Sequence, residues 1–264
     1  MSRRRGHIYA EVLGEGPDVV MIHGWGMHGG VWRVFAECLA ASFRVTLIDL
    51  PGHGRSGMVA DFDLDGVGAA LLEVAPARAH WLGWSLGAAI ALNLAHRCPE
   101  RVASLVMMAG SARFARSEDW PHAMDPEVLA KFARDMMDDC HHTLLRFLGL
   151  QVWGLEHSRE LMKELRHRVE ECEEPDADAL KAGLAILQTA DLRSVLAALR
   201  LPLLLLMGAR DRLVPHPAGH AMADLASNAE LCELEAAGHV PFLTHPEACA
   251  HALHDFWCRH EYAA

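Results

Sequence analysis

Long apolar runs and paired cysteines are missing from this sequence of 264 residues. Polar or charged residues interrupt every apolar run before about 15 positions accumulate, and no apolar segment follows the basic residues at the start of the chain. We therefore expect neither a signal peptide nor a transmembrane helix, and hence a cytoplasmic protein with no membrane partner.

The cysteines and histidines lack the spacings of a disulfide framework or a metal site. The seven cysteines are an odd number and include no C-x-x-C pair, which predicts reduced thiols, mostly buried as small hydrophobic residues. The eighteen histidines include no His-Glu-x-x-His motif, and the adjacent His141 and His142 would point in different directions from a helix. We expect no metal site and no cofactor.

Basic residues are scarce relative to acidic ones. The chain has 24 Lys and Arg against 35 Asp and Glu, a net charge of −11 that argues against a general nucleic-acid-binding protein. Hydrophobic residues make up 52% of the chain, which is enough for the core of one large α/β domain.

Short apolar runs alternate with helical segments along most of the chain. The predicted strands cover 19–22, 45–48, 80–82, 102–108, 201–208 and, with the alternating pattern of an edge strand, 229–234. The predicted helices cover 30–41, 62–75, 86–96, 216–226 and 246–260. This alternation predicts an α/β fold with βαβ units and a mostly parallel central sheet flanked by helices.

The alternation stops between residues 113 and 196. This stretch has no strand-like run and is rich in helix-forming and acidic residues, with prolines between its segments. We interpret residues 113–196 as an all-helical cap of about four helices, inserted into a core formed by 1–112 and 197–264. We expect the protein to be a monomer.

The most informative motif is Gly-Trp-Ser-Leu-Gly at 83–87, between the apolar run 79–82 and the helical stretch 88–95. This strand–turn–helix context is typical of a nucleophile elbow, in which a sharp turn exposes one serine and only glycines tolerate the close approach of strand and helix. A serine hydroxyl is a weak nucleophile at neutral pH. Ser85 therefore needs a base, an acid that orients the base, and donors for an oxyanion.

An acid and a base follow Ser85 in the chain order found in enzymes with this turn. Asp211 lies just after the predicted strand 201–208, and His239 follows the predicted strand 229–234 on a loop with a preceding glycine. Asp211 could instead cap a helix or pair with Arg210 or Arg212, and His239 could be an ordinary surface histidine. Position and order favour the catalytic interpretation of both.

Two backbone amides are expected to form the oxyanion hole. One belongs to Leu86, directly after the serine, and the other to Trp25, in the glycine-rich loop that follows the predicted strand 19–22. We expect His23 to be structural, with its ring bonded to the loop backbone. Trp84 either lies near the serine or packs in the core.

Asp49 also follows a predicted strand, at 45–48, and could be mistaken for the catalytic acid. It precedes Ser85, which does not fit the order of the triad. We expect Asp49 to shape its loop, with Arg55 and Ser56 in its hydrogen-bond network.

Through these motifs the whole chain resembles the α/β-hydrolase superfamily. The segments that carry this resemblance are 23–26, 49–56, 83–87, Asp211 and 238–239. Further segments resemble the family of pimeloyl-[acyl-carrier protein] methyl ester carboxylesterases of biotin synthesis, namely 23–26 with 31–33, 81–87, 99–102 and 146–151.

This resemblance implies a substrate, a partner and two sets of binding residues. The substrate would be a pimeloyl chain on acyl carrier protein, with its far carboxyl group held as a methyl ester. The acyl site would comprise Trp25, Ser85, Leu86, Phe147, Leu148, Gly149, Leu150, Gln151 and His239. The carrier protein would dock on Arg146, Arg159 and Lys163 of the cap, with His142 at a further position that is basic in a relative.

The charge pattern of these residues does not decide whether the cap has a docking surface. Arg159, Lys163 and Arg166 recur at i, i+4 and i+7, so they share one helix face that could steer an acidic partner. The cap as a whole carries more acids than bases, and the same face could simply be solvated. A carrier-docking surface and a solvated helix face are therefore both compatible with this pattern.

Two other functions fit the same motifs. The first is a general short-chain carboxylesterase, a lactonase or a carbon–carbon bond hydrolase, because one fold hosts many reactions. The second is a non-catalytic small-molecule receptor that keeps the triad. A dehalogenase or epoxide hydrolase is disfavoured, because those enzymes use Asp where this chain has Ser85.

Overall fold

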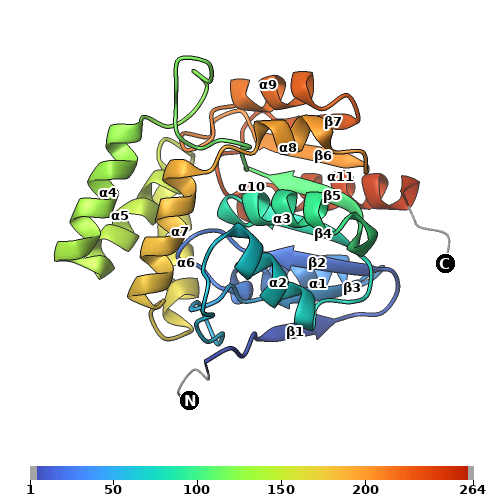
Figure 1. Cartoon of the computed structure of the whole chain (residues 1–264), viewed down its shortest axis with the longest axis horizontal. Helices are drawn as coiled ribbons and strands as arrows, with labels where there is room; N and C mark the ends of the chain where they lie inside the picture. The colour runs from blue at the N-terminus through green and yellow to red at the C-terminus, as the bar shows by residue number, and fades with distance from the viewer. Residues whose placement is uncertain (1–4, 261–264) are drawn as a thin grey trace.

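A seven-stranded sheet with helices on both faces forms the centre of the computed structural model, which describes residues 5–260 (Figure 1). The strand order is β1-β3-β2-β4-β5-β6-β7, and all neighbouring pairs are parallel except β1 with β3. This confirms the predicted α/β-hydrolase fold with a mostly parallel sheet. The basic start at residues 1–4, on which part of the signal-peptide prediction rests, lies outside the described residues.

All six predicted strands are present, with a seventh that the apolar pattern missed. The strands are β1 (Ala10–Leu13), β2 (Asp18–Ile22), β3 (Arg44–Ile48), β4 (Ala79–Trp84), β5 (Val102–Met108), β6 (Leu203–Gly208) and β7 (Ala229–Leu234). The missed strand, β1, is short and only partly buried, so it has no continuous apolar run. Its antiparallel pairing with β3 at the sheet edge depends on contacts that its own residues do not reveal.

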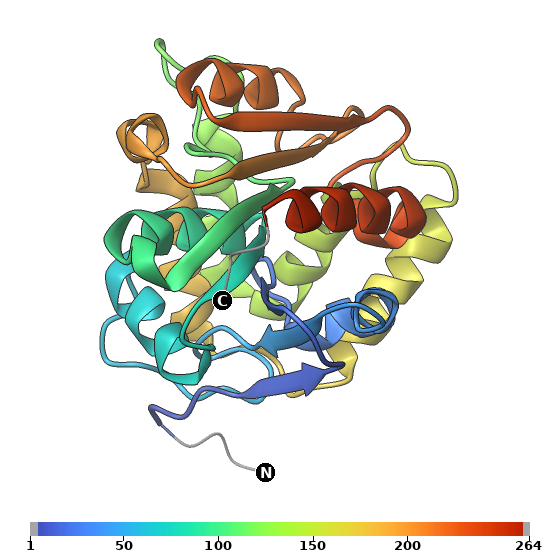
Figure 2. The same ribbon diagram turned by 90° about the vertical axis from the view of Figure 1, so that its right-hand side faces the viewer.

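The five helices predicted in the core are present, the first beginning as a 3₁₀ turn, whereas the short helices at 99–101 and 241–244 were not predicted. The helices are η1 (Gly29–Trp32), α1 (Arg33–Leu39), α2 (Leu64–Val74), α3 (Leu86–Arg97), η2 (Pro99–Arg101), α4 (Pro126–Asp138), α5 (Cys140–Val152), α6 (Ser158–Glu170), α7 (Ala177–Thr189), α8 (Arg193–Ala198), α9 (Pro217–Leu225), α10 (Pro241–Thr244) and α11 (Pro246–Arg259). Figure 2 shows α1 and α11 on one face of the sheet and α2, α3 and α8 on the other. Within residues 5–260, every helix is too short or too polar to span a bilayer.

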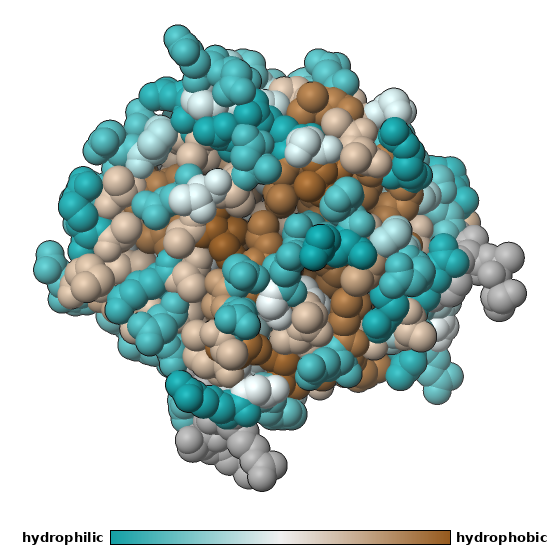
Figure 3. Space-filling view, viewed as in Figure 1, coloured by the Kyte–Doolittle hydropathy of each residue, from teal (hydrophilic) through white to brown (hydrophobic). Residues whose placement is uncertain are grey.

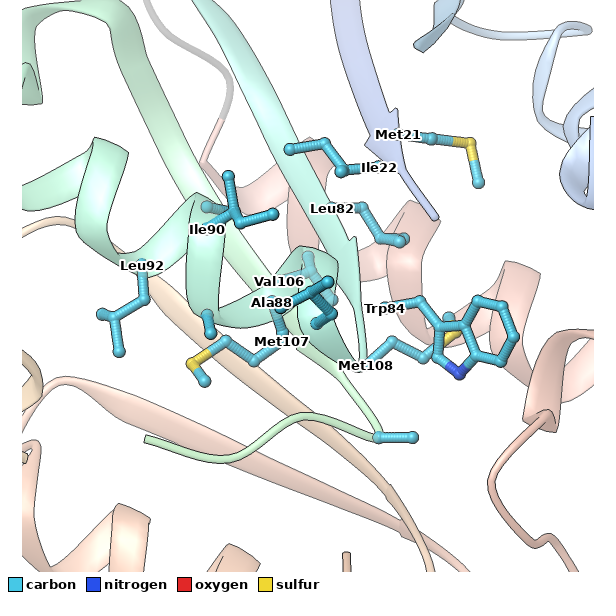
Figure 4. Close-up of a cluster of buried hydrophobic side chains, with 14 of the residues drawn as sticks. Met21, Ile22, Leu82, Trp84, Ala88, Ile90, Leu92, Val106, Met107 and Met108 are labelled. Atoms are coloured by element: carbon cyan, nitrogen blue, oxygen red, sulfur yellow. The ribbon is translucent and has the colours of Figure 1, made fainter. Parts of the chain in front are cut away.

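Part of the hydrophobic core lies where α3 packs on the central strands (Figure 4). Fully buried aliphatic, methionine and tryptophan side chains from β2, β4, α3 and β5 meet there, among them Met21, Ile22, Leu82, Trp84, Ala88, Ile90, Leu92, Val106, Met107 and Met108. Burying each large apolar side chain stabilises the fold by roughly 1.5–3 kcal/mol. The turn between β4 and α3 therefore joins two elements whose apolar side chains are fully buried.

Helices α4–α7 lie together beyond the carboxyl ends of the parallel strands, on the left of Figure 1. Hydrophilic and apolar residues are mixed over this side of the surface (Figure 3). The two connections to this helical group lie side by side: the amide of Leu192 donates to the carbonyl of Ala112 at 2.8 Å, and Arg113 pairs with Asp191 at 2.7 Å. The boundary predicted after residue 196 falls inside α8, and the division into core and cap stays a prediction.

Candidate active site

Ser85 occupies the sharp turn between β4 and α3, with a backbone conformation that few residues adopt. Its φ is 56° and its ψ is −117°, outside the regions favoured by residues with a side chain. Both flanking glycines are required by close packing: a Cβ at Gly83 would lie 2.2 Å from the carbonyl oxygen of Gly87, and one at Gly87 would lie 2.6 Å from that of His23. The structure therefore has the geometry of a nucleophile elbow.

A chain of hydrogen bonds joins Ser85, His239 and Asp211. The Nε2 atom of His239 lies 2.9 Å from the hydroxyl of Ser85, and its Nδ1 lies 2.8 Å from Oδ2 of Asp211. A carboxylate only accepts, so Nδ1–H of His239 donates to Asp211, which leaves Nε2 to accept from the serine hydroxyl. All three residues are buried, with exposed fractions of 2%, 1% and 6% for Ser85, His239 and Asp211. The ring is placed to remove the hydroxyl proton.

The second oxygen of Asp211 fixes the orientation of its carboxylate. Oδ1 accepts from the amides of Leu213 at 2.8 Å and Val214 at 3.0 Å. Within the described part of the chain, Asp211 makes no ion pair with the exposed Arg210 or Arg212. Asp211 therefore neither caps a helix nor pairs with one of the two neighbouring arginines.

Trp25, in the loop after β2, and Leu86, at the start of α3, both lie beside Gly183 of α7, where an added Cβ would be 2.8 Å from the Trp25 ring and 3.1 Å from the Leu86 side chain. Leu86 is the first residue of α3, so its amide has no acceptor within the helix. Gly26 takes a φ of 74°, which turns the chain after Trp25, and the Trp25 indole donates to the carbonyl of Leu180 in α7 at 2.8 Å. An oxyanion hole formed by the amides of Trp25 and Leu86 stays a prediction that this arrangement supports.

His23 is structural, as its position suggested. Its Nε2 accepts from the amide of Leu50 at 2.9 Å, so the proton lies on Nδ1, which donates to the carbonyl of Gly24 at 2.8 Å. Burial, reinforced by the neighbouring His53, lowers the pKa of His23 well below its usual value. A neutral ring therefore ties the loop after β2 to the loop after β3.

Asp49 shapes a loop and takes no part in the hydrogen-bonded chain at Ser85. Its carboxylate accepts from the amides of Gly29 at 2.6 Å and Arg55 at 2.7 Å, and its carbonyl accepts from the Ser56 hydroxyl at 2.7 Å. This is the network expected for Asp49 from its position before Ser85.

One contact at the site was missed by reasoning from the sequence. The indole Nε1–H of Trp84 donates to the backbone carbonyl of His239 at 2.7 Å, so Trp84 both packs in the core and holds the histidine loop. No local signal could have revealed a partner 155 positions away in the chain.

The segment 147–151 lies in α5, so its four side chains do not share one direction. Phe147, Leu148 and Gln151 are buried, whereas Gly149 and Leu150 are half-buried. Phe147 packs edge-on against the Trp25 ring, with 4.8 Å between the ring centroids. The buried Oε1 of Gln151 has no hydrogen-bond partner among the described residues. The acyl-binding role of the whole segment stays a prediction.

The three predicted docking cations differ in their surroundings. Arg146 pairs with Asp135 at 2.6 Å and lies over the Phe132 ring. Arg159 and Lys163 are exposed on α6, and neither has an ion-pair partner among residues 5–260. His142 is held by Asp139 at 2.7 Å.

Comparison with known proteins gives the family. The alpha/beta hydrolase fold family matches residues 17–246. A pimeloyl-[acyl-carrier protein] methyl ester esterase of Methylococcus capsulatus is 47% identical over 249 residues, which cover 94% of this chain and 98% of that protein. Proteins of the same name from Xanthomonas campestris and Klebsiella pneumoniae are both 42% identical, over 94% and 93% of this chain and 98% and 96% of theirs. This chain belongs to the pimeloyl-[acyl-carrier protein] methyl ester esterase family.

Solved structures show the fold of this esterase independently. An esterase from Exiguobacterium antarcticum superposes with a TM-score of 0.86 at 22% identity, covering 94% of each chain. An enol-lactonase from Burkholderia xenovorans superposes with a TM-score of 0.82 at 21% identity, covering 95% of this chain and 96% of the other. Because the chain belongs to this esterase family and its Ser85 contacts His239, the protein is a serine carboxylic-ester hydrolase.

Proposed function

We propose that this esterase hydrolyses the methyl ester of pimeloyl-[acyl-carrier protein], releasing methanol and the free carboxylate of the carrier-bound pimeloyl chain, as a step of biotin synthesis. The observation that carries the proposal is the hydrogen-bonded chain from Ser85 through His239 to Asp211, in a protein 47% identical to a pimeloyl-[acyl-carrier protein] methyl ester esterase. Ser85, His239 and Asp211 are the proposed nucleophile, base and acid.

The first half of the reaction forms an acyl-enzyme. His239 takes the hydroxyl proton of Ser85 at Nε2 while the serine oxygen attacks the ester carbonyl. The amides of Trp25 and Leu86 donate to the resulting oxyanion, each contributing on the order of 3 kcal/mol to transition-state stabilisation. The protonated ring then gives its proton to the departing methoxy group, which leaves as methanol.

The second half returns the enzyme to its starting state. His239 removes a proton from a water molecule at Nε2 while the water oxygen attacks the acyl group on Ser85. The ring then gives this proton to the serine oxygen as the bond between that oxygen and the acyl group breaks, which releases the carboxylic acid and restores the Ser85 hydroxyl. Asp211 remains ionised throughout. It keeps the Nδ1–H tautomer in place and stabilises the positive charge that the ring carries in each half-reaction.

Entry of this substrate is proposed to involve the helices that pack on the Trp25 loop. Ser85 is almost completely buried, and the Trp25 loop is bonded to Leu180 of α7 and packed against Phe147 of α5. We infer that α5 and α7 separate from the loop after β2 when the acyl chain binds.

The experiment that tests the function compares two substrates on the wild-type protein and on Ser85→Ala. Wild-type protein is expected to release methanol from pimeloyl-[acyl-carrier protein] methyl ester with a higher kcat/KM than it shows on nitrophenyl esters of short acids. Ser85→Ala is expected to lose at least 10⁴-fold in turnover on both substrates with an unchanged thermal midpoint.

The other outcomes point to the alternative functions. Equal or better turnover of small esters, with no release of methanol from the carrier-bound ester, would favour a general carboxylesterase. Labelling of Ser85 by a fluorophosphonate without turnover of any ester would favour a small-molecule receptor. Full activity in Ser85→Ala would exclude the proposed nucleophile. Complementation of a biotin-requiring strain that lacks such an esterase tests the pathway.

A further inference from the structure

Three side chains that the esterase chemistry does not use meet on the surface beside β7. His216 is the residue directly before α9, His220 lies on α9 one turn further on, and Glu233 lies on β7. Nδ1 of His216 is 3.1 Å from one carboxylate oxygen of Glu233, and Nε2 of His220 is 3.0 Å from the other. One potential ligand atom from each residue lies within 4.8 Å of the others.

The local structure explains why these residues converge. Positions i and i+4 of a helix lie on the same side, so both imidazoles face one direction. Glu233 is on the outermost strand of the sheet, next to α9, and its side chain is exposed. The other exposed acid of this strand, Glu230, is paired with Arg259, the last residue of α11, and with His260, which follows it. The carboxylate of Glu233 is therefore left to the two histidines.

We propose that His216, His220 and Glu233 form a surface site for a divalent transition-metal ion such as Zn²⁺. Two imidazole nitrogens and one carboxylate oxygen are a ligand set that suits Zn²⁺, with water completing a tetrahedron. Bonds of about 2.0–2.2 Å place the ligand atoms of a tetrahedron roughly 3.4 Å apart. The two histidine–glutamate pairs are already about this close, at 3.1 and 3.0 Å, and all three ligand atoms lie within 4.8 Å of one another, so small rotations of exposed side chains suffice. The net charge of −11 attracts cations to the protein.

The site lies between the two loops that hold the acid and the base. His216 follows Asp211 by five positions at the end of the loop after β6, and Glu233 precedes His239 by six positions on β7. A bound ion would join α9 to β7 and so tie together the elements that flank both loops. An ion that binds only the folded chain stabilises it by mass action.

Isothermal titration with Zn²⁺ tests the proposal on the whole protein. Wild-type protein is expected to bind one ion per chain with a micromolar Kd, and a hundredfold excess over Kd should raise Tm by roughly 5–10 °C in a way that EDTA reverses. His220→Ala and Glu233→Gln should each weaken binding at least tenfold and abolish the rise in Tm. Both replace exposed side chains, so Tm without zinc should stay within about 2 °C of wild type.

The matched control is His251→Ala, which removes another exposed histidine paired with a carboxylate, that of Asp255 on α11. It should bind zinc as wild type does, and so should Ser85→Ala, which separates this proposal from the esterase function. Absence of micromolar binding would show that the cluster is only an ion-pair group and overturn the proposal. Binding that is unchanged in His220→Ala and Glu233→Gln would place the ion elsewhere, for example at Cys258 and His254, with the same consequence.

Discussion

The indole nitrogen of Trp84 donates a hydrogen bond of 2.7 Å to the backbone carbonyl of His239. Trp84 is the residue before Ser85 in the elbow, so one rigid element holds both the serine and the loop of its base. The ring of Trp84 also lies 5.8 Å from that of His239. The position of the imidazole therefore depends on the same strand that places the hydroxyl.

Trp84→Phe removes this hydrogen bond and keeps an aromatic ring in the core. The buried carbonyl of His239 loses its donor, which should destabilise the fold by about 1–3 kcal/mol and lower kcat roughly tenfold with little change in KM. Trp32→Phe is the matched control, because the buried Nε1 of Trp32 has no partner among the described residues. Equal losses of kcat in both variants would contradict a positioning role for Trp84.

Asp211→Asn should abolish most activity while the fold persists. The amide oxygen can keep accepting from Leu213 and Val214, so the NH₂ group faces His239 and forces its proton onto Nε2. That nitrogen can then no longer accept from Ser85, and kcat should fall by about 10⁴. Ester hydrolysis and circular dichroism measure the two effects separately.

Asp49→Asn provides the contrasting case of a buried aspartate that follows another parallel strand. Its two carboxylate oxygens each accept from a backbone amide, and an asparagine would turn its NH₂ group toward one of them. Urea unfolding should show a loss of about 1–3 kcal/mol, whereas kcat of the folded fraction should fall less than tenfold. A loss of kcat as large as in Asp211→Asn would assign Asp49 to the chemistry.

Gly83→Ala should prevent normal folding of the elbow. Its Cβ would lie 2.2 Å from the carbonyl oxygen of Gly87, in backbone that cannot move aside, so we expect a loss of more than about 3 kcal/mol. Gly68→Ala in α2 is the control, since its Cβ would make only ordinary contacts, at 3.8 Å or more, with Leu94. That change should stabilise the protein by about 0.5–1 kcal/mol, as alanine favours a helix interior. Thermal and urea unfolding measure both.

Acid should destabilise the protein through His80 in β4. Burial, with the nearby charges of His260 and Arg78, lowers the pKa of His80 from 6.5 to about 4. Between pH 6.5 and 4 the ring of His80 therefore stays neutral in the folded protein but gains a proton in the unfolded chain. The contribution of His80 to the free energy of unfolding is complete above pH 6.5 and is lost as pH falls toward 4. The loss is at most about 3 kcal/mol. His80→Gln should flatten the pH dependence of the urea midpoint in this range, and an unchanged slope would refute the assignment.

Charge reversal on α6 tests the docking surface. Arg159→Glu combined with Lys163→Glu should raise KM for the carrier-bound ester at least tenfold and leave the kinetics on a small ester unchanged, because an acidic partner is then repelled. The rise in KM should shrink in high salt. Lys181→Glu on α7, an exposed cation paired with Asp178, is the control. A similar KM for the carrier-bound ester in all three proteins would show that α6 is only a solvated face.

Much of the active site could be predicted from the sequence, because each of its motifs consists of residues that are consecutive in the chain. The elbow needs a buried strand, two glycines around a serine and a helix start, all within ten positions. Asp211 and His239 follow predicted strands, and the carboxyl ends of parallel strands meet at one edge of a sheet. Their meeting with Ser85 therefore follows from the order of strands and loops.

The proposed acyl-binding segment is a part of the site whose orientation could not be predicted from the sequence. A run of five residues such as 147–151 contains no information on which side of its helix faces the site until α5 is packed against Trp25. Likewise, β1 has too short an apolar pattern to be recognised without its partner β3.

The amino-acid sequence alone specified the fold class, the nucleophile turn and the chain order of acid and base, because periodicity and turn chemistry act between neighbours. Packing in three dimensions settled the support of His239 by Trp84, the closure of the Trp25 loop by Leu180, and the meeting of Glu233 with two histidines. Each of these contacts joins side chains whose separation in the chain carries no pattern, and their approach depends on how whole helices and strands settle against one another.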